Sequence, residues 1–152
     1  MKKRVVFFTL LAGLLFTANY SFSQIRKIPS SATENLKEKY PDADKVQWKD
    51  QISHFTAKFV LDSKSYEAHF DNDGNWKESL VTIDESELPA EVKDGISKSK
   101  YSDWTIDKVE KLETADGNVQ YRLQVKSGDI KKKILYFNPD GKLAKDHITL
   151  WF

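Results

Sequence analysis

The chain has 152 residues, with 24 Lys or Arg and 23 Asp or Glu, so its formal charge is +1 at pH 7. Basic and acidic residues are interleaved along the sequence, whereas nucleic-acid binding needs a basic excess concentrated on one face, so a nucleic-acid partner is not expected. The absence of cysteine excludes disulfide bonds, thiol catalysis and cysteine-ligated zinc, and stability must therefore come from an apolar core.

The first 23 residues have the pattern of a secretion signal. Residues 2–4 are all basic, and residues 5–18 form an apolar run without charge. Ser21 and Ser23 place small side chains at the −3 and −1 positions of a signal peptidase site. The apolar run is shorter than the roughly 20 residues of a transmembrane helix. The sequence predicts a periplasmic or secreted protein with no membrane attachment after cleavage of residues 1–23.

Two segments, beginning at Ile28-Pro29 and at Leu88-Pro89, have the pattern of amphipathic helices. In both, apolar side chains recur every four positions, which places them along one helix face. A proline near the first turn fits a helix start, and Ser31 with Glu34 has the spacing of a capping box. Pro41 ends the first helix, because a residue before proline disfavours helical geometry.

Each helical segment is followed by four segments in which apolar and polar side chains alternate. The expected strands span residues 45–49, 54–61, 65–71 and 75–82 in the first set, and 106–114, 118–126, 130–137 and 143–150 in the second. The last turn of each set has Asp or Asn first and Gly fourth, at 71–74 and 138–141. This composition predicts a type I turn followed by a left-handed residue and a β-bulge.

The two sets together predict an α+β fold built as a tandem repeat of a helix plus a four-stranded antiparallel sheet. We expect the first repeat to span residues 24–84 and the second to span residues 85–152. The linker at 84–87 is too short to separate two domains widely. The sequence therefore predicts one compact, two-layer α/β unit, in which a long sheet carries both helices on the same side.

The chain resembles the PepSY-like family, also described as β-lactamase-inhibitor-like (BLIP-like), in Tyr40-Pro41-Asp42-Ala43, Val46, Trp48, Tyr66-Glu67-Ala68-His69-Phe70 and Asp71-Asn72-Asp73-Gly74-Asn75-Trp76. The resemblance covers nearly the whole chain after the signal as two copies, although the second copy has Ser102 in place of the proline and lacks a counterpart of Trp48. It implies helices covering one face of an antiparallel sheet, and export to the periplasm or beyond. The shared residues are mostly structural, so they support a fold and leave the activity open.

The sequence offers little catalytic or metal-binding chemistry. Asp71, Asp73 and Gly74 resemble part of an EF-hand loop, but with Gly74 as the sixth residue the twelfth is Leu80, where a glutamate is required. The sequence contains no nucleophile elbow and no phosphate-binding glycine loop. We therefore expect turns instead of calcium sites, no cofactor and no enzymatic activity.

The three histidines are expected to lie apart on the surface. If residues 62–65 form the loop of the second hairpin, His69 lies opposite Lys58, and His54 lies at the far end of that hairpin. His147 belongs to the second repeat. No pair of histidines with the spacing of metal ligands results from this arrangement.

Strict alternation assigns most aromatic side chains to the core and a polar set to the open side of the sheet. The expected core aromatics are Trp48, Phe55, Phe59, Phe70, Trp76 and Phe137. The expected open side carries Thr56, Lys58, Val60, Glu67, His69, Lys77, Ser79, Gln120, Arg122, Gln124, Ile134 and Tyr136. A Tyr and an Ile beside Arg and Lys have the composition of a protein-recognition patch. The candidate partner-binding residues are therefore Lys58, His69, Arg122, Ile134 and Tyr136, with ordinary surface residues as the alternative.

Two functions from different classes follow from these observations. The missing catalytic motifs and the resemblance favour an exported, non-catalytic binding module for a protein or peptide, such as an inhibitor or partner of an exported enzyme or envelope protein. The alternative is a small-ligand-binding protein or hydrolase with a site between the repeats, which requires a concave cleft with convergent polar groups.

Overall fold

A computed structural model describes residues 26–148 of the chain. The predicted signal peptide, residues 1–23, lies outside the described residues, as do the last two residues of the final expected strand. Within residues 26–148, no helix is long and apolar enough to cross a membrane.

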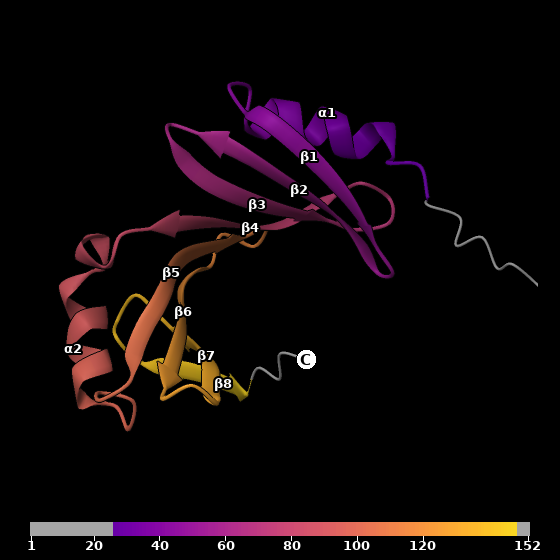
Figure 1. The fold of residues 1–152 in the computed structure, drawn as a ribbon. Helices are drawn as coiled ribbons and strands as arrows, with labels where there is room; N and C mark the ends of the chain where they lie inside the picture. The colour runs from indigo at the N-terminus through magenta and orange to yellow at the C-terminus, as the bar shows by residue number, and fades with distance from the viewer. Residues whose placement is uncertain (1–25, 149–152) are drawn as a thin grey trace, which may run out of the picture.

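Each half of the described chain consists of one α-helix followed by four strands (Figure 1). The first half contains α1 (Ser30–Lys39), β1 (Asp44–Gln51), β2 (His54–Leu61), β3 (Lys64–Phe70) and β4 (Trp76–Ile83). A short 3-10 helix, η1 (Glu85–Glu87), leads into α2 (Ala90–Lys98), β5 (Thr105–Thr114), β6 (Val119–Ser127), β7 (Lys131–Phe137) and β8 (Leu143–Ile148). The predicted α+β order of elements is confirmed.

All eight strands belong to one antiparallel sheet, in which every strand pairs with its neighbour in sequence. The two halves join where residues 78–83 of β4 pair with residues 109–114 of β5. Tyr66 packs in the cluster under α1 and lies opposite Val81, while Ile83, on the same face of β4, packs in the cluster under α2. Both helices therefore cover the same face, and Figure 1 shows them on the outer side of the curved sheet.

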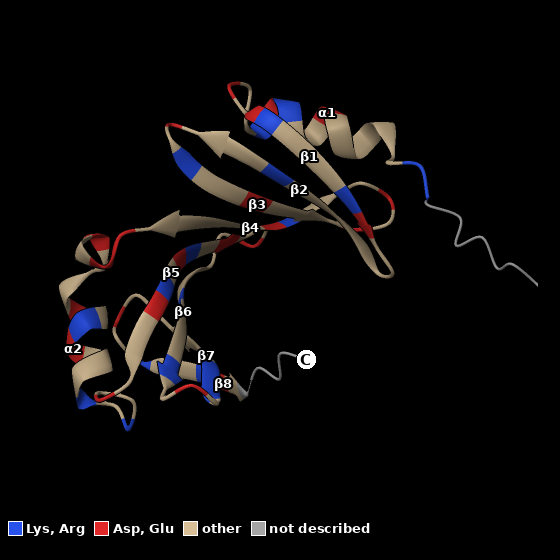
Figure 2. Cartoon of the chain, in the orientation of Figure 1, with Lys and Arg blue, Asp and Glu red and all other residues tan. Residues whose placement is uncertain are grey.

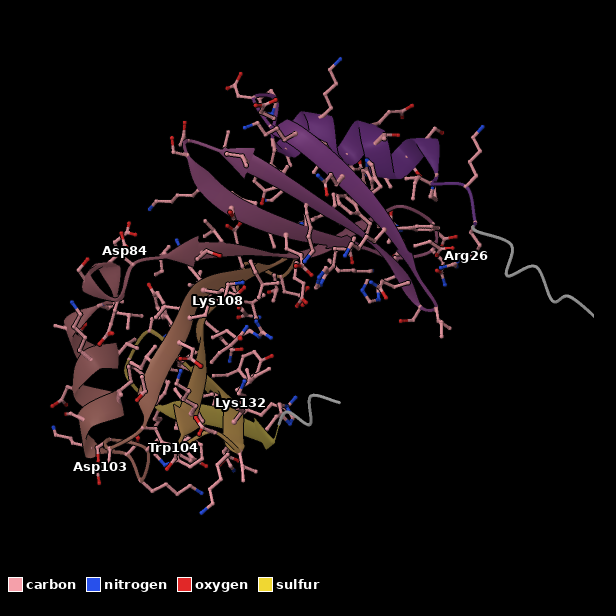
Figure 3. The ribbon with its side chains drawn as sticks, viewed as in Figure 1. Arg26, Asp84, Asp103, Trp104, Lys108 and Lys132 are labelled. Carbon is pink, nitrogen blue, oxygen red and sulfur yellow. The ribbon has the colours of Figure 1, made fainter. Side chains whose placement is uncertain are left out.

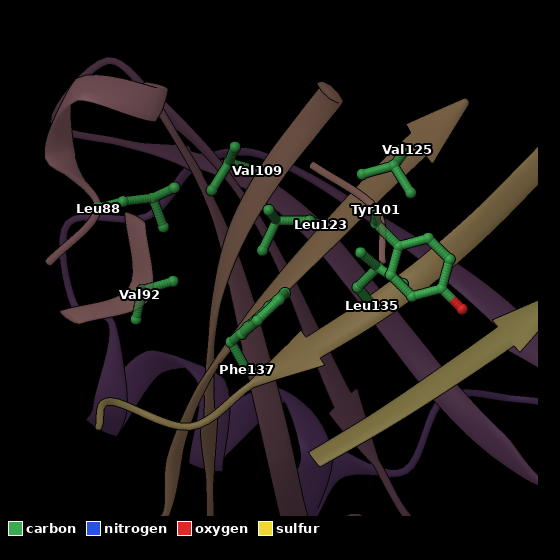
Figure 4. Close-up of a cluster of buried hydrophobic side chains, with 8 residues drawn as sticks. All are labelled: Leu88, Val92, Tyr101, Val109, Leu123, Val125, Leu135 and Phe137. Atoms are coloured by element: carbon green, nitrogen blue, oxygen red, sulfur yellow. The ribbon is translucent and has the colours of Figure 1, made fainter. Parts of the chain in front are cut away.

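Each helix lies over its own hydrophobic cluster. Under α1 the buried residues are Ala32, Leu36, Phe55, Ala57, Phe59, Ala68 and Phe70. Under α2 they are Leu88, Val92, Tyr101, Val109, Leu123, Val125, Leu135 and Phe137 (Figure 4). Burying one such Leu, Val or Phe side chain contributes about 1.5–3 kcal/mol, so these contacts dock the helices. The predicted aromatic core is confirmed, with Trp48 and Trp76 partly buried at its edge.

In both halves the last hairpin turn packs against the first turn of the helix. Gly74 and Gly141 have positive φ angles of 86° and 80°, and a β-bulge adjoins each turn, as predicted. A Cβ atom on Gly74 would lie 2.1 Å from the Ser31 hydroxyl oxygen, and one on Gly141 would lie 2.1 Å from the Glu91 carbonyl oxygen. The Ser31 hydroxyl donates to the Asp73 carbonyl at 2.6 Å, so the expected capping box at the start of α1 does not form.

The hairpin between β2 and β3 is tighter than the sequence suggested. Asp62 and Ser63 both have positive φ angles, 50° and 63°, which is the geometry of a two-residue type I′ turn. Turn length fixes the register of the strands, so the pairing of β2 with β3 differs from the expected one. His69 consequently lies opposite Thr56, and its expected position opposite Lys58 is wrong.

The β-bulge beside Phe70 changes which side chains of β4 reach the open face. His69 lies opposite Glu78, whereas Phe70 lies opposite Trp76. Ser79 therefore points toward the helices, where it is 4% exposed and accepts a hydrogen bond from Trp76 Nε1 at 2.8 Å. The expected position of Ser79 on the open side is wrong, because strict alternation does not continue through a bulge.

Candidate functional site

The face of the sheet opposite the helices is hollowed, and we call it the concave face. Strand pairing places Lys58, Glu67, Leu80, Leu112 and Gln120 in one row across β2 to β6. These residues line a cavity of about 670 Å³ that extends as far as β8 and so crosses the junction between the two halves. Figure 3 shows side chains from both halves projecting toward this side of the curved sheet.

The five candidate partner-binding residues all lie on the concave face. Lys58, His69, Arg122 and Tyr136 line the cavity. Ile134 is on the same face of β7 as Tyr136, two residues earlier, outside the cavity lining. Ile134 and Tyr136 are half-buried instead of fully exposed. The structure thus brings together residues that are far apart in the sequence.

His69 is held between two glutamates. Its Nδ1 atom lies 2.9 Å from Glu78 Oε1, and its Nε2 atom lies 3.0 Å from Glu67 Oε1. Because an ionised carboxylate only accepts hydrogen bonds, both ring nitrogens carry a proton and the ring is a cation. Glu67 Oε2 also lies 2.9 Å from Lys58 Nζ. The His69 side chain lies on the open face as expected but is half-buried, with 22% of its surface exposed.

These contacts shift the pKa values of the three groups in opposite directions. Burial alone would lower the pKa of His69, but hydrogen bonds to Glu67 and Glu78 raise it to about 9. The hydrogen bond from His69 lowers the pKa of Glu67 to about 2, and it also lowers the pKa of Glu78. At neutral pH the cluster therefore contains one imidazolium and two carboxylates that are engaged as acceptors.

His54 lies beside this cluster, contrary to the expected separation of the histidines. The tight turn makes it the diagonal neighbour of His69 across the hairpin, and the two ring centroids are 5.1 Å apart. His147 is exposed on β8, and its ring meets Tyr136 edge-on at 6.1 Å. In the part of the chain that the structure describes, no group of three or more His, Asp or Glu side chains is arranged to hold a metal ion.

Glu110 forms a second ionic centre, which the sequence analysis missed. It is 4% exposed, its Oε1 atom lies 2.5 Å from Lys108 Nζ, and its Oε2 atom pairs with Arg122 Nη1. Burial would lower the pKa of Arg122, but the charge of Glu110 and a hydrogen bond with Tyr136 raise it. The sequence feature that could have revealed Glu110 is the alternation along β5. Lys108, Glu110 and Leu112 are two residues apart and therefore share the open face.

Two leucines form the centre of the concave face. Leu80 on β4 lies directly opposite Leu112 on β5, and they are 8% and 6% exposed. The sequence did not reveal this leucine pair, because Leu80 and Leu112 meet only through the pairing of β4 with β5, which joins the two halves. The cavity thus has an apolar centre surrounded by charged and amide side chains.

The arrangement is chemically suited to recognition. The lining carboxylates are paired with cations, and the lining imidazole is already protonated. Among the described residues of the cavity, no free base lies next to a nucleophile, which acid–base or nucleophilic catalysis would require.

Comparison with known proteins places the fold. A scan of protein-family profiles matches residues 53–145 to the family described as "Putative beta-lactamase-inhibitor-like, PepSY-like". A search of curated proteins finds no match.

Several solved structures share this architecture. A BLIP-like protein from Bacteroides fragilis NCTC 9343 is 26% identical with a TM-score of 0.71, over 83% of this chain and 94% of that one. A DUF2874 family protein from Bacteroides uniformis ATCC 8492 is 22% identical with a TM-score of 0.74, over 79% and 88%. A protein from Bacteroides eggerthii DSM 20697, described as one of the "putative periplasmic proteins", is 22% identical with a TM-score of 0.75, over 81% and 90%. The latter two likenesses show the fold alone.

Proposed function

The chain belongs to the PepSY-like, β-lactamase-inhibitor-like family, and we propose that it works as an exported, non-catalytic module that binds a protein or peptide on its concave face. The observation that carries this proposal is the cavity in which polar groups of both halves surround Leu80 and Leu112. An apolar centre within a polar rim is the usual anatomy of a protein-recognition surface. We assign partner contact to Lys58, His69, Arg122, Ile134 and Tyr136.

The comparisons support this proposal in two respects. The Bacteroides fragilis relative is described as BLIP-like, which favours a protein-binding role, such as inhibition of an exported enzyme or association with an envelope protein. The Bacteroides eggerthii relative is described as periplasmic, which agrees with the secretion-signal pattern of residues 1–23. A periplasmic or secreted location is therefore part of the proposal.

The test uses a pair of side chains that face each other across β7 and β8, Tyr136 and Lys145. The mature protein is immobilised and exposed to periplasmic extract, and the captured proteins are identified and then titrated as purified components. We expect Tyr136→Ala with Lys145→Ala to weaken the binding of a captured partner at least ~10-fold, as for a central aromatic contact. Arg122→Ala is unsuitable, because it removes one of the two cations that pair with the buried Glu110 and would therefore destabilise the fold.

The matched control is the Tyr–Lys pair on the opposite face of the same sheet. Tyr121 and Lys111 face each other across β6 and β5 on the helix-covered side. Tyr121→Ala with Lys111→Ala removes the same groups, and circular dichroism shows whether each double variant is folded. If both folded variants bind the partner as tightly as the wild type, the concave face is not the binding surface.

A small-ligand-binding protein or hydrolase is the second candidate, favoured by the cavity crossing the junction between the halves. Its volume of about 670 Å³ is within the roughly 300–1,000 Å³ of small-molecule sites. Native mass spectrometry of protein purified from its own periplasm tests it. A retained small molecule that is displaced in the Tyr136→Ala and Lys145→Ala variant would favour this candidate over protein binding.

A further inference from the structure

Charge is distributed unevenly between the two faces of the sheet. The described residues 26–148 contain 21 Lys or Arg and 23 Asp or Glu, so this part of the chain is slightly acidic. Figure 2 shows basic and acidic positions on the strands of both halves, and alternation divides them between the two faces. Strand pairing and alternation, with the ion pairs, place eight cations on the concave face, counting His69, against five carboxylates: Asp44, Glu67, Glu78, Asp107 and Glu110.

The cations at the centre of the concave face are neutralised within the protein. His69 and Lys58 contact Glu67, and Lys108 and Arg122 contact Glu110. These contacts fix the side chains before any partner arrives. The central ion pairs therefore provide an ordered polar floor but little uncompensated charge.

The uncompensated charge lies around this floor. Lys49 lies opposite Thr56, Lys132 lies opposite Lys126, and Lys145 lies opposite Tyr136, which places these three lysines on the concave face. All three are exposed, and none forms an ion pair with another residue between 26 and 148. They come from β1, β7 and β8, so they surround the cavity from both halves.

We propose that the partner presents an acidic protein segment carrying an apolar side chain, with its carboxylates toward Lys49, Lys132 and Lys145 and its apolar group toward Leu80 and Leu112. This inference rests on the proposed function and names the chemistry of the partner. A cationic rim attracts an acidic segment and speeds its encounter with the protein. Leu80 and Leu112, which are 8% and 6% exposed to solvent, supply the apolar contact.

The same face disfavours a polyphosphate backbone. Nucleic-acid binding rests on cations that neutralise phosphates. Here Glu67, Glu78 and Glu110 occupy the middle of the surface and already engage its central cations. A phosphate chain laid across the face would meet these carboxylates, whereas an acidic peptide can place its apolar side chain there.

The experiment measures fluorescence anisotropy with four labelled probes and the intact mature protein. The probes are a peptide of glutamates around a central Phe, the same peptide with lysines in place of glutamates, oligoglutamate without Phe, and oligothymidylate of the same charge. We expect the first probe to bind most tightly, and its affinity to fall as salt increases. We expect Lys49→Glu, Lys132→Glu and Lys145→Glu together to weaken it at least ~10-fold.

The matched control reverses three lysines on the helix-covered side, Lys37, Lys111 and Lys131, which gives the same change in net charge. Binding that falls equally in both triple variants would reflect net charge alone and overturn the proposal. Failure of the acidic Phe peptide to bind, or equal binding of oligothymidylate, overturns it as well. A natural partner that needs Tyr136 but tolerates the reversal of Lys49, Lys132 and Lys145 would overturn this inference and leave the proposed function standing.

Discussion

Replacing His69 with Gln should reduce stability in a pH-dependent way that follows from its position between Glu67 and Glu78. Folding raises the pKa of His69 from 6.5 to about 9, so the folded protein holds this proton more tightly than the unfolded chain. The stabilisation is therefore complete below pH 6.5 and is lost as the pH rises through 9. The pKa of Glu67 is lowered, so its contribution is present above pH 4.5 and is lost as the pH falls toward 2.

The magnitude follows from the shift and from the exposure of the groups. The change in the pKa of His69 corresponds to about 3.4 kcal/mol if all of it became stability. The side chains of His69, Glu67 and Glu78 are 22%, 34% and 36% exposed, so solvent screens part of this interaction. We expect the free energy of unfolding of the wild type to exceed that of His69→Gln by about 1–2 kcal/mol at pH 6, and by much less near pH 10.

Urea unfolding followed by circular dichroism across this pH range measures the difference directly. His147→Gln is the matched control, because His147 is exposed on β8 and has no carboxylate partner among the described residues. Its free energy of unfolding should follow that of the wild type throughout. A His69→Gln curve parallel to the wild type between pH 6 and 10 would refute the imidazolium assignment.

Three further predictions concern the fold. Gly141→Ala should lower the free energy of unfolding in urea by at least ~3 kcal/mol, because the new Cβ atom clashes with the Glu91 carbonyl and the backbone is in the left-handed region. Gly117 has nearly the same φ but open space around it, so Gly117→Ala should cost only about 1 kcal/mol. Because β4 and β5 are paired, proteolysis in the linker at 84–87 should not release two independently folded halves; two fragments that each unfold cooperatively would contradict this. Calcium should leave the melting temperature unchanged, because Asp71 already accepts hydrogen bonds from the amides of Asp73 and Asn75; a clear rise on adding calcium would show a missed site.

The order of elements and the core could be predicted because both depend on local patterns. A repeat of about four residues places Ala32 and Leu36 on one helix face, and alternation places Phe55, Ala57 and Phe59 on one strand face. The left-handed glycines could also be predicted, since their turns have a recognisable composition. None of these inferences needed the register between strands.

The details of the concave face could not be predicted, because they depend on register. The turn at Asp62-Ser63 decides that His69 lies opposite Thr56, and the bulge beside Phe70 decides that Glu78 is within reach of His69. A shift of one residue in either place changes the partners of every charged group. The bulge after residue 69 was predicted from its turn, but alternation along β4 was expected to continue through it, and the turn at Asp62-Ser63 is shorter than the expected loop, so the ionic centres were missed.

The charge of the concave face could not be seen in the sequence, because residues of both signs follow one another along each strand. Counted along the sequence, β5 reads Asp107, Lys108, Val109, Glu110 and Lys111, which is a mixture with little net charge. Alternation places Lys108 and Glu110 on the concave face and Lys111 on the other face, and strand pairing then brings Arg122 to Glu110 as a second cation. An electrostatic argument about a sheet protein therefore has to be made for each face after pairing is known, and the overall charge of the chain does not exclude a strongly polar binding surface.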